Sequence, residues 1–101
     1  MSEKAIYKEK VIVDMKRPKM YRVILLNDDY TSMEFVIEVL VGIFHKTAAE
    51  ATKIMLDVHE KGKGIVGIYT YDIALTKILQ TEDAAKSEEY PLKAVMEEEW
   101  E

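Results

Sequence analysis

The sequence contains no cysteine. Disulfide bonds and thiolate chemistry are therefore excluded, and for so small a chain the lack of disulfides favours the cytoplasm. The sequence also has no apolar run approaching the roughly 20 residues that a membrane-spanning helix needs. Its start, Met1-Ser2-Glu3-Lys4, lacks the apolar core of a signal peptide. We therefore expect a cytoplasmic protein that has no membrane partner.

Basic residues are too few for a nucleic-acid partner. Lysine and arginine number 14 against 19 acidic residues, and the formal net charge is −5. A protein that binds phosphates needs a basic face, so nucleic-acid binding is excluded as the main function. The 101 residues are 49% hydrophobic and 33% charged, which is typical of one globular domain.

Enzyme motifs are missing as well. The sequence has no G-x-S-x-G, no glycine-rich phosphate loop and no H-E-x-x-H. We therefore expect no catalytic residue, no metal and no cofactor.

Composition divides the chain into three parts. Residues 1–19 mix charges with scattered apolar residues and contain Pro18, which favours a flexible N-terminal arm. Residues 20–96 carry the periodic patterns and form the predicted core domain. Residues 97–101, Glu-Glu-Glu-Trp-Glu, are expected to be a frayed acidic C-terminal end.

The periodic patterns predict the order β-α-α-β-α-β. Residues 21–26, 64–69 and 92–96 are typical of strands. A capping box at 31–34 and a second at 47–50 open the first two helices, Gly62 ends the second, and a third runs from Thr70 to about Lys86. We expect an α+β domain with three helices packed on one face of a small three-stranded antiparallel sheet.

Two short polar patterns are candidates for function. Asn27-Asp28-Asp29 follows the first strand, and His59 lies near the end of the second helix. Taken alone, these patterns favour a turn and a solvated imidazole. Nothing local fixes them as a metal site or an acid–base set, and no fourth metal ligand is evident.

Two longer segments carry a resemblance to a known family. The run MYRVILLNDDYTSMEFV at 20–36 resembles the hallmark segment of ClpS, the N-end-rule adaptor of the Clp protease. The run MLDVHEKGKG at 55–64 resembles the second hallmark of that family. With Pro91-Leu92, the similarity covers residues 20 to about 96. Ser32 stands where many members have proline, and both residues suit a first helical turn.

The resemblance implies an adaptor that recognises the N-terminal destabilising residues Leu, Phe, Tyr and Trp of substrate proteins. Asn27, Asp28 and His59 would bind the substrate's α-amine. The residues expected to line its side-chain pocket are Thr31, Met33, Val36, Met55, Val58 and Leu92.

The resemblance also implies partners for delivery. Asp72 and Lys77, on the third helix, match positions that contact the N-terminal domain of a ClpA-type AAA+ unfoldase, which works with the ClpP protease. The arm would engage the pore of that unfoldase. The expected adaptor is a monomer without cofactors.

Two functions from other classes remain open at this point. One is an assembly module, like the C-terminal domain of a ribosomal protein of similar topology. That role would leave Asn27, Asp28 and His59 without a purpose. The other is an aminopeptidase, for which the sequence offers no activated water or nucleophile.

Overall fold

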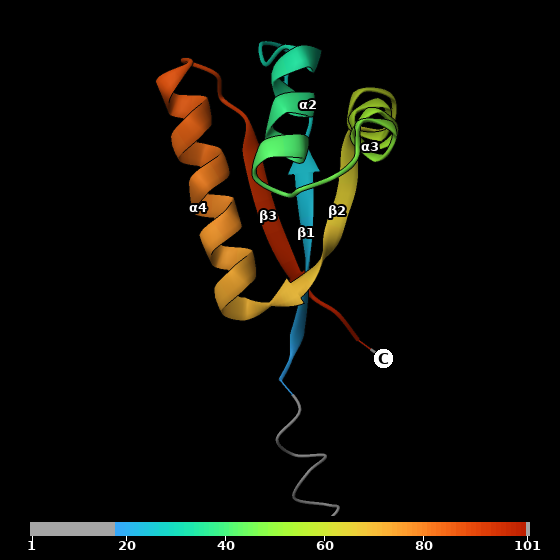
Figure 1. Ribbon diagram of the computed structural model, residues 1–101, viewed down its shortest axis with the longest axis vertical. Helices are drawn as coiled ribbons and strands as arrows, with labels where there is room; N and C mark the ends of the chain where they lie inside the picture. Colours follow the sequence, from blue (N-terminus) through green and yellow to red (C-terminus); the bar gives the residue numbers. More distant parts are fainter. Residues whose placement is uncertain (1–17, 101) are drawn as a thin grey trace, which may run out of the picture.

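The computed structural model describes residues 18–100 (Figure 1). Residues 1–17, which hold most of the predicted arm, lie outside this range. The secondary-structure elements are β1 (Met20–Leu26), α2 (Met33–Gly42), α3 (Ala48–Lys61), β2 (Lys63–Thr70), α4 (Tyr71–Ser87) and β3 (Lys93–Glu98). The predicted order of strands and helices is confirmed.

The three strands form one antiparallel sheet in the order β2-β1-β3. The central strand β1 therefore pairs on both sides, and its last residue, Leu26, lies between Lys63 and Lys93. Figure 1 shows α2 in front of β1, α3 beside β2 and α4 beside β3. The predicted α+β architecture, with three helices on a small antiparallel sheet, is confirmed.

The core lies between the sheet and the helices. Side chains alternate between the two faces of a strand, so Val23 and Leu25 are completely buried against the helices. Each helix contributes one apolar side to the core. The buried hydrophobic residues are Phe35, Val36, Val39 and Leu40 on α2, Ala51, Met55 and Val58 on α3, and Ala74, Ile78 and Ala85 on α4. Within residues 18–100, no helix has the length and apolar character needed to cross a membrane.

The helix starts differ in one respect from the sequence-based expectation. The second helix begins with the predicted capping box, in which Thr47 and Glu50 exchange hydrogen bonds. The first helix is instead capped by Ser32, whose Oγ accepts a hydrogen bond from the Phe35 N–H at 3.1 Å. The box predicted at 31–34 is therefore wrong by one residue, and the hydroxyl of Thr31 is left for another partner.

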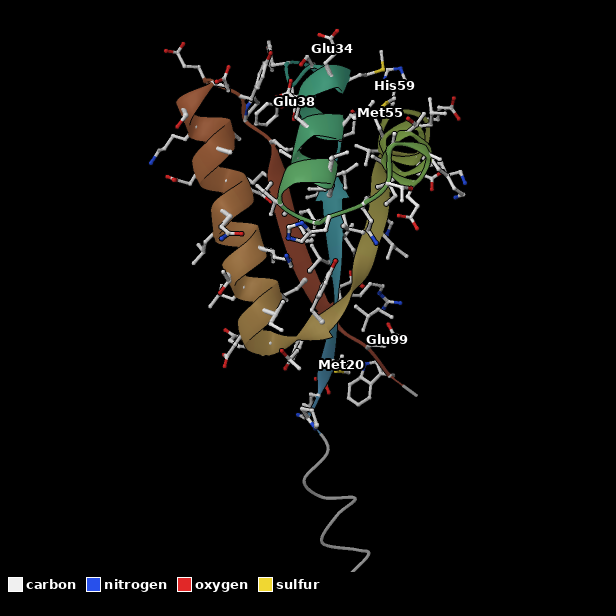
Figure 2. The ribbon with its side chains drawn as sticks, viewed as in Figure 1. Met20, Glu34, Glu38, Met55, His59 and Glu99 are labelled. Atoms are coloured by element: carbon white, nitrogen blue, oxygen red, sulfur yellow. The ribbon has the colours of Figure 1, made fainter. Side chains whose placement is uncertain are left out.

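The acidic C-terminal end is also more ordered than predicted. Strand β3 continues to Glu98, two residues beyond the expected limit. Arg22 on β1 forms ion pairs with Glu97 at 3.5 Å and with Glu99 at 3.0 Å. The Glu99 N–H donates to the Met20 carbonyl at 2.7 Å, and Figure 2 shows both residues at the lower end of the sheet. These contacts fix the end of β3 beside the start of β1, so a frayed end at 97–99 is wrong.

Helix α3 approaches β2 so closely that one strand position requires glycine. A Cβ atom added to Gly64 would lie 2.8 Å from Cγ2 of Val58 and 3.0 Å from the carbonyl oxygen of Ile54. One of these neighbours is backbone, so it cannot rotate away. Gly64 therefore sets the distance between the end of α3 and the sheet.

We predict that Gly64→Ala lowers the free energy of unfolding by about 1–3 kcal/mol, because the added methyl group overpacks this contact. Gly42→Ala is the matched control, since a Cβ there meets nothing within 4 Å. Replacing a glycine inside a helix with alanine stabilises the folded protein by roughly 0.5–1 kcal/mol, so the control variant should be as stable as the parent or more stable. Urea unfolding of both variants measures the difference. Equal stabilities would contradict the close approach of α3 to β2.

Candidate functional site

The end of β1 and the end of α3 meet through the backbone. The Asn27 N–H donates to the Gly62 carbonyl at 2.9 Å. Gly62 ends α3 in the left-handed conformation with φ 90°, and its own N–H donates to the Val58 carbonyl. Glycine adopts this conformation at little cost, so the chain turns directly from α3 into β2. The loop after β1 is thereby held beside the last turn of α3, which carries His59.

A cavity of about 510 Å³ lies where this loop, the start of α2 and the end of α3 come together. Its lining residues are Asn27, Asp28, Asp29, Tyr30, Thr31, Ser32, Met33, Val36, Met55, Val58 and His59. Figure 2 shows Met55 and His59 near one another at the upper end of the molecule. Residues predicted from two separate sequence segments therefore line one cavity.

One side of the cavity is apolar. The side chains of Val36, Met55 and Val58 are almost completely buried, with exposed fractions of 3–8%. Met33 is the first residue of α2 and is 49% exposed, so it lies at the rim rather than in the core. The cavity thus has a buried apolar floor and a half-exposed apolar edge.

The Asp28 carboxylate organises the polar side. Oδ1 accepts hydrogen bonds from the Tyr30 N–H at 2.8 Å and the Thr31 N–H at 2.7 Å, and Oδ2 accepts from the Thr31 hydroxyl at 2.8 Å. Burial alone would raise the pKa of Asp28, but the hydrogen bonds from Thr31 and Tyr30 outweigh it and lower the pKa. Asp28 therefore keeps its negative charge at neutral pH.

Asn27 and His59 present their side chains to solvent at the same cavity. Neither side chain bonds to another residue in the range 18–100, so their polar atoms are available to a ligand. In the same range, no three histidine or acidic side chains are grouped so that they would hold a metal ion.

One predicted pocket residue lies elsewhere, and three lining residues were missed. Leu92 is buried in the core and lines a different cavity, beside Tyr90. Asp29, Tyr30 and Ser32 were not predicted to line the site. Asp29 belongs to the polar run Asn27-Asp28-Asp29, which was a candidate for function. Tyr30 and Ser32 are signalled only by their position between predicted residues of the same loop.

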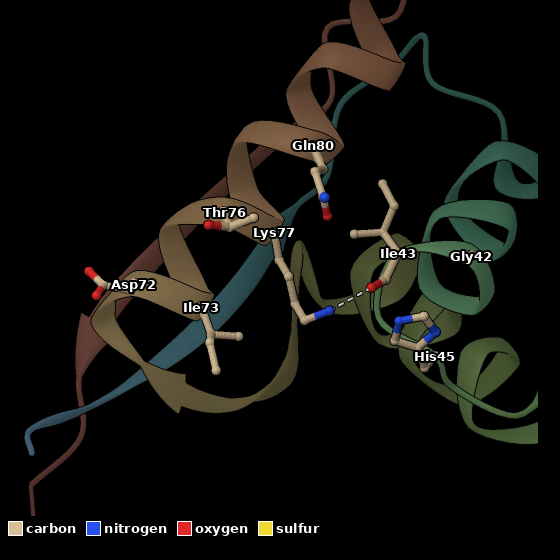
Figure 3. Close-up of a pocket in the computed structure, with 8 residues that line it drawn as sticks. All are labelled: Gly42, Ile43, His45, Asp72, Ile73, Thr76, Lys77 and Gln80. Carbon is tan, nitrogen blue, oxygen red and sulfur yellow. Dashed lines mark hydrogen bonds between the residues drawn. The ribbon is translucent and has the colours of Figure 1, made fainter.

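The two predicted docking residues line a separate groove between α2 and α4, with a volume of about 640 Å³. Figure 3 shows Asp72 and Lys77 on α4, with Lys77 reaching toward the end of α2. There the Lys77 Nζ donates to the Ile43 carbonyl at 2.8 Å. The groove and the cavity share no lining residue.

Comparison with known proteins identifies the family. The model of the family described as ATP-dependent Clp protease adaptor protein ClpS matches residues 16–95. The chain belongs to the ClpS family. The ClpS adapter protein of Acetivibrio thermocellus is 66% identical over 99 residues, covering 98% of this chain and all of that relative. That of Syntrophus aciditrophicus is 62% identical over 81 residues, covering 80% and 76% of the two chains.

A solved ClpS structure supports the same assignment. ClpS2 of Agrobacterium tumefaciens, bound to L-phenylalaninamide, superposes with a TM-score of 0.79 at 40% identity. The match covers 82% of this chain and all of that one. The resemblance predicted from the sequence is confirmed, and the chain is a ClpS adaptor for a Clp protease. The name adaptor implies a non-catalytic role.

The depressed pKa of Asp28 predicts a pH dependence of the loop. A carboxyl group with a lower pKa in the folded state contributes stability above its unfolded pKa of about 3.9 and loses it as the pH falls through the folded pKa. We expect Asp28→Asn to be less stable than the parent at pH 7, and the gap to narrow below about pH 4. Thermal unfolding from pH 7 to pH 3 measures both. A gap that is constant over this range would show that the charge of Asp28 does not hold the loop.

Proposed function

We propose that the cavity binds the N-terminal residue of substrate proteins. Asn27, Asp28 and His59 hold the α-amine, and the apolar floor holds the side chain of an N-terminal Leu, Phe, Tyr or Trp. The observation that carries the proposal is that one cavity joins a polar, negatively charged edge to a buried apolar floor. An apolar pocket with a few converging polar groups is the usual form of a small ligand site.

The polar edge matches the chemistry of an α-ammonium group, which has three donors and no acceptor. The Oδ2 atom of Asp28 accepts one hydrogen bond, from Thr31, so it retains acceptor capacity for the amine or for a bridging water. Its charge strengthens that bond. The side-chain carbonyl of Asn27 and a ring nitrogen of His59 supply further acceptors at the same cavity.

The apolar floor suits side chains of more than one shape. Val36 and Val58 are stiff and buried, whereas Met55 and Met33 have several rotatable bonds and adapt to a branched or a flat side chain. The ligand of the related ClpS2 supports a site with a polar part for the amine and an apolar part for the side chain. L-phenylalaninamide carries a free α-amino group, an aromatic side chain and an amide where the next peptide bond would follow.

Delivery is the second half of the proposal. The groove between α2 and α4 docks the N-terminal domain of a ClpA-type unfoldase that works with ClpP, while the arm at residues 1–19 engages its pore. Because the groove and the cavity share no lining residue, one adaptor can hold substrate and unfoldase together. The arm joins β1 at Met20, the opposite end of that strand from Asn27.

We predict that His59→Ala weakens binding of a peptide with an N-terminal leucine by about 1.5–3 kcal/mol, because the charged amine loses one hydrogen-bond acceptor. Acetylating the peptide should have a similar effect on the parent protein. Thr52→Ala is the control, since Thr52 lies on the exposed side of the same helix. Fluorescence anisotropy measures all three. An acetylated peptide that binds as tightly as the free one would exclude an amine site.

The same titration separates the alternative functions if the peptide is recovered afterwards. An adaptor binds the peptide and returns it intact. An assembly module does not bind it, and an aminopeptidase returns it shortened by one residue. Mass spectrometry of the recovered peptide distinguishes these outcomes.

We predict that Met33 excludes N-terminal residues branched at Cβ. Isoleucine and valine carry a second heavy atom on Cβ that cannot rotate away from a wall beside the backbone, whereas leucine branches one atom later. Met33→Ala should therefore admit isoleucine and valine peptides with a gain of roughly 1–3 kcal/mol. Leucine and phenylalanine peptides should bind about as before.

Because Met33 is half-exposed, the test separates a change in specificity from a loss of stability. A buried methionine would cost about 2–5 kcal/mol of stability on truncation. At 49% exposure the melting temperature should change little, so a change in specificity can be measured on a folded protein. If folded Met33→Ala still rejects isoleucine, another residue limits the pocket.

A further inference from the structure

Met33 is the most accessible methionine in the part of the chain that the structure describes. The sequence holds six methionines, of which Met20, Met33, Met55 and Met96 lie within residues 18–100. Met33 is 49% exposed, whereas Met55 is 8% exposed and the other two are partly buried. A dissolved reagent that attacks thioether sulfur therefore reaches Met33 before the other three.

The exposure of Met33 follows from its place in helix α2. A helical side chain leans toward the N-terminal end of its helix and covers the turn before its own position. Met33 is the first residue after the cap at Ser32, so no earlier turn of the helix lies beneath it. Val36, one turn later, is buried. The same place puts Met33 in the lining of the cavity, together with Val36 and Met55.

The chain offers an oxidant no thiol, because the sequence contains no cysteine. An exposed thiolate is ordinarily the side chain that peroxides oxidise most readily, and the methionine thioether is the other sulfur that they convert. Burial within the core shields the sulfur of Met55. Of the described residues, Met33 is therefore the preferred target of a peroxide.

We propose that Met33 is an oxidation site at which hydrogen peroxide turns substrate binding down. The thioether sulfur attacks one peroxide oxygen, so that an S–O bond forms and the O–O bond breaks. The proton of the transferred oxygen passes to the leaving oxygen, which departs as water. Sulfur loses two electrons and the peroxide gains them. This inference rests on the proposed function of the cavity and adds regulation to it.

The sulfoxide changes the character of the cavity edge. It replaces a flexible apolar end with a polar, chiral group. A substrate side chain that fills the apolar part of the cavity would take the sulfoxide oxygen out of water, and the side chains of Val36 and Met55 offer no donor to replace that water. Truncation in Met33→Ala adds no such polar group. Oxidation should therefore weaken leucine binding where truncation spares it.

The test treats the full chain with hydrogen peroxide and follows two quantities over time. Peptide mapping by mass spectrometry gives the sulfoxide fraction at each methionine. Fluorescence anisotropy gives the affinity for a peptide with an N-terminal leucine. The melting temperature of each sample is measured as well, so that a loss of the site is distinguished from unfolding.

We expect Met33 to oxidise about tenfold faster than the buried Met55, or faster still. Affinity for the leucine peptide should fall about tenfold in step with the Met33 sulfoxide, at an unchanged melting temperature, because a polar group at the edge loses its water. Methionine sulfoxide reductases of both epimer specificities should restore the affinity together with the thioether. A saturating leucine peptide should slow oxidation of Met33, and its acetylated form should not.

Two variants identify the responsible sulfur. Met33→Leu keeps an apolar side chain without sulfur, so peroxide should leave its affinity where it started, whatever that starting value is. Met96→Leu removes a methionine that does not line the cavity, so this variant should lose affinity on oxidation as the parent does. Each variant is compared with itself before and after treatment.

Three results would overturn the inference. Full sulfoxide at Met33 with unchanged affinity would show that the modification does not regulate the site. Loss of affinity in oxidised Met33→Leu would place the sensitive residue elsewhere, and a melting temperature that falls with the affinity would make the effect one of unfolding. If the untreated parent does not bind the leucine peptide, the proposed function fails first and the regulation with it, while the sulfoxide map still reports whether Met33 is the oxidised residue.

Discussion

The hydrogen bond from the Asn27 N–H to the Gly62 carbonyl is the constraint on which the site depends. It joins the loop after β1 to the turn after α3, two segments that are more than 30 residues apart in the chain. It requires α3 to end in a left-handed residue, and it requires α3 to lie close to β2, where Gly64 has no side chain. Gly62 and Gly64, which do not line the cavity, therefore set the position of His59 relative to Asp28.

Asp28 has two functions that reinforce one another. Its three hydrogen bonds close the loop over Tyr30 and Thr31, and the same bonds stabilise the ionised carboxylate. A loop that is already ordered loses little entropy when a ligand binds, and a carboxylate that stays charged attracts an ammonium group. One side chain, Asp28, thus both orders the loop before a ligand binds and supplies the negative charge of the site.

Short sequence patterns predicted the features that neighbouring residues determine. These include the Thr47 capping box, the end of α3 at Gly62 and the apolar sides of the helices. The errors occurred where a distant contact decides. Thr31 and Ser32 are both good caps, and the bond of Thr31 to Asp28 leaves the cap to Ser32. Glu97 and Glu98 have poor strand propensity, but Arg22 on the neighbouring strand extends β3 over them. Leu92 was assigned to the pocket by resemblance alone. The structure buries it in the core, where it lines another cavity, and its role in the substrate pocket stays a prediction.

Helix α2 links the two proposed sites. It begins with Met33 at the rim of the cavity and ends near Ile43 in the wall of the groove, and its 10 residues span about 15 Å. The N-terminal cap at Ser32 contacts one end of this helix, and the hydrogen bond from Lys77 to the Ile43 carbonyl contacts the other. The distance between the substrate site and the docking groove is then set by the length of one helix. In the proposed function, the adaptor would therefore hold its substrate at a fixed position relative to the unfoldase.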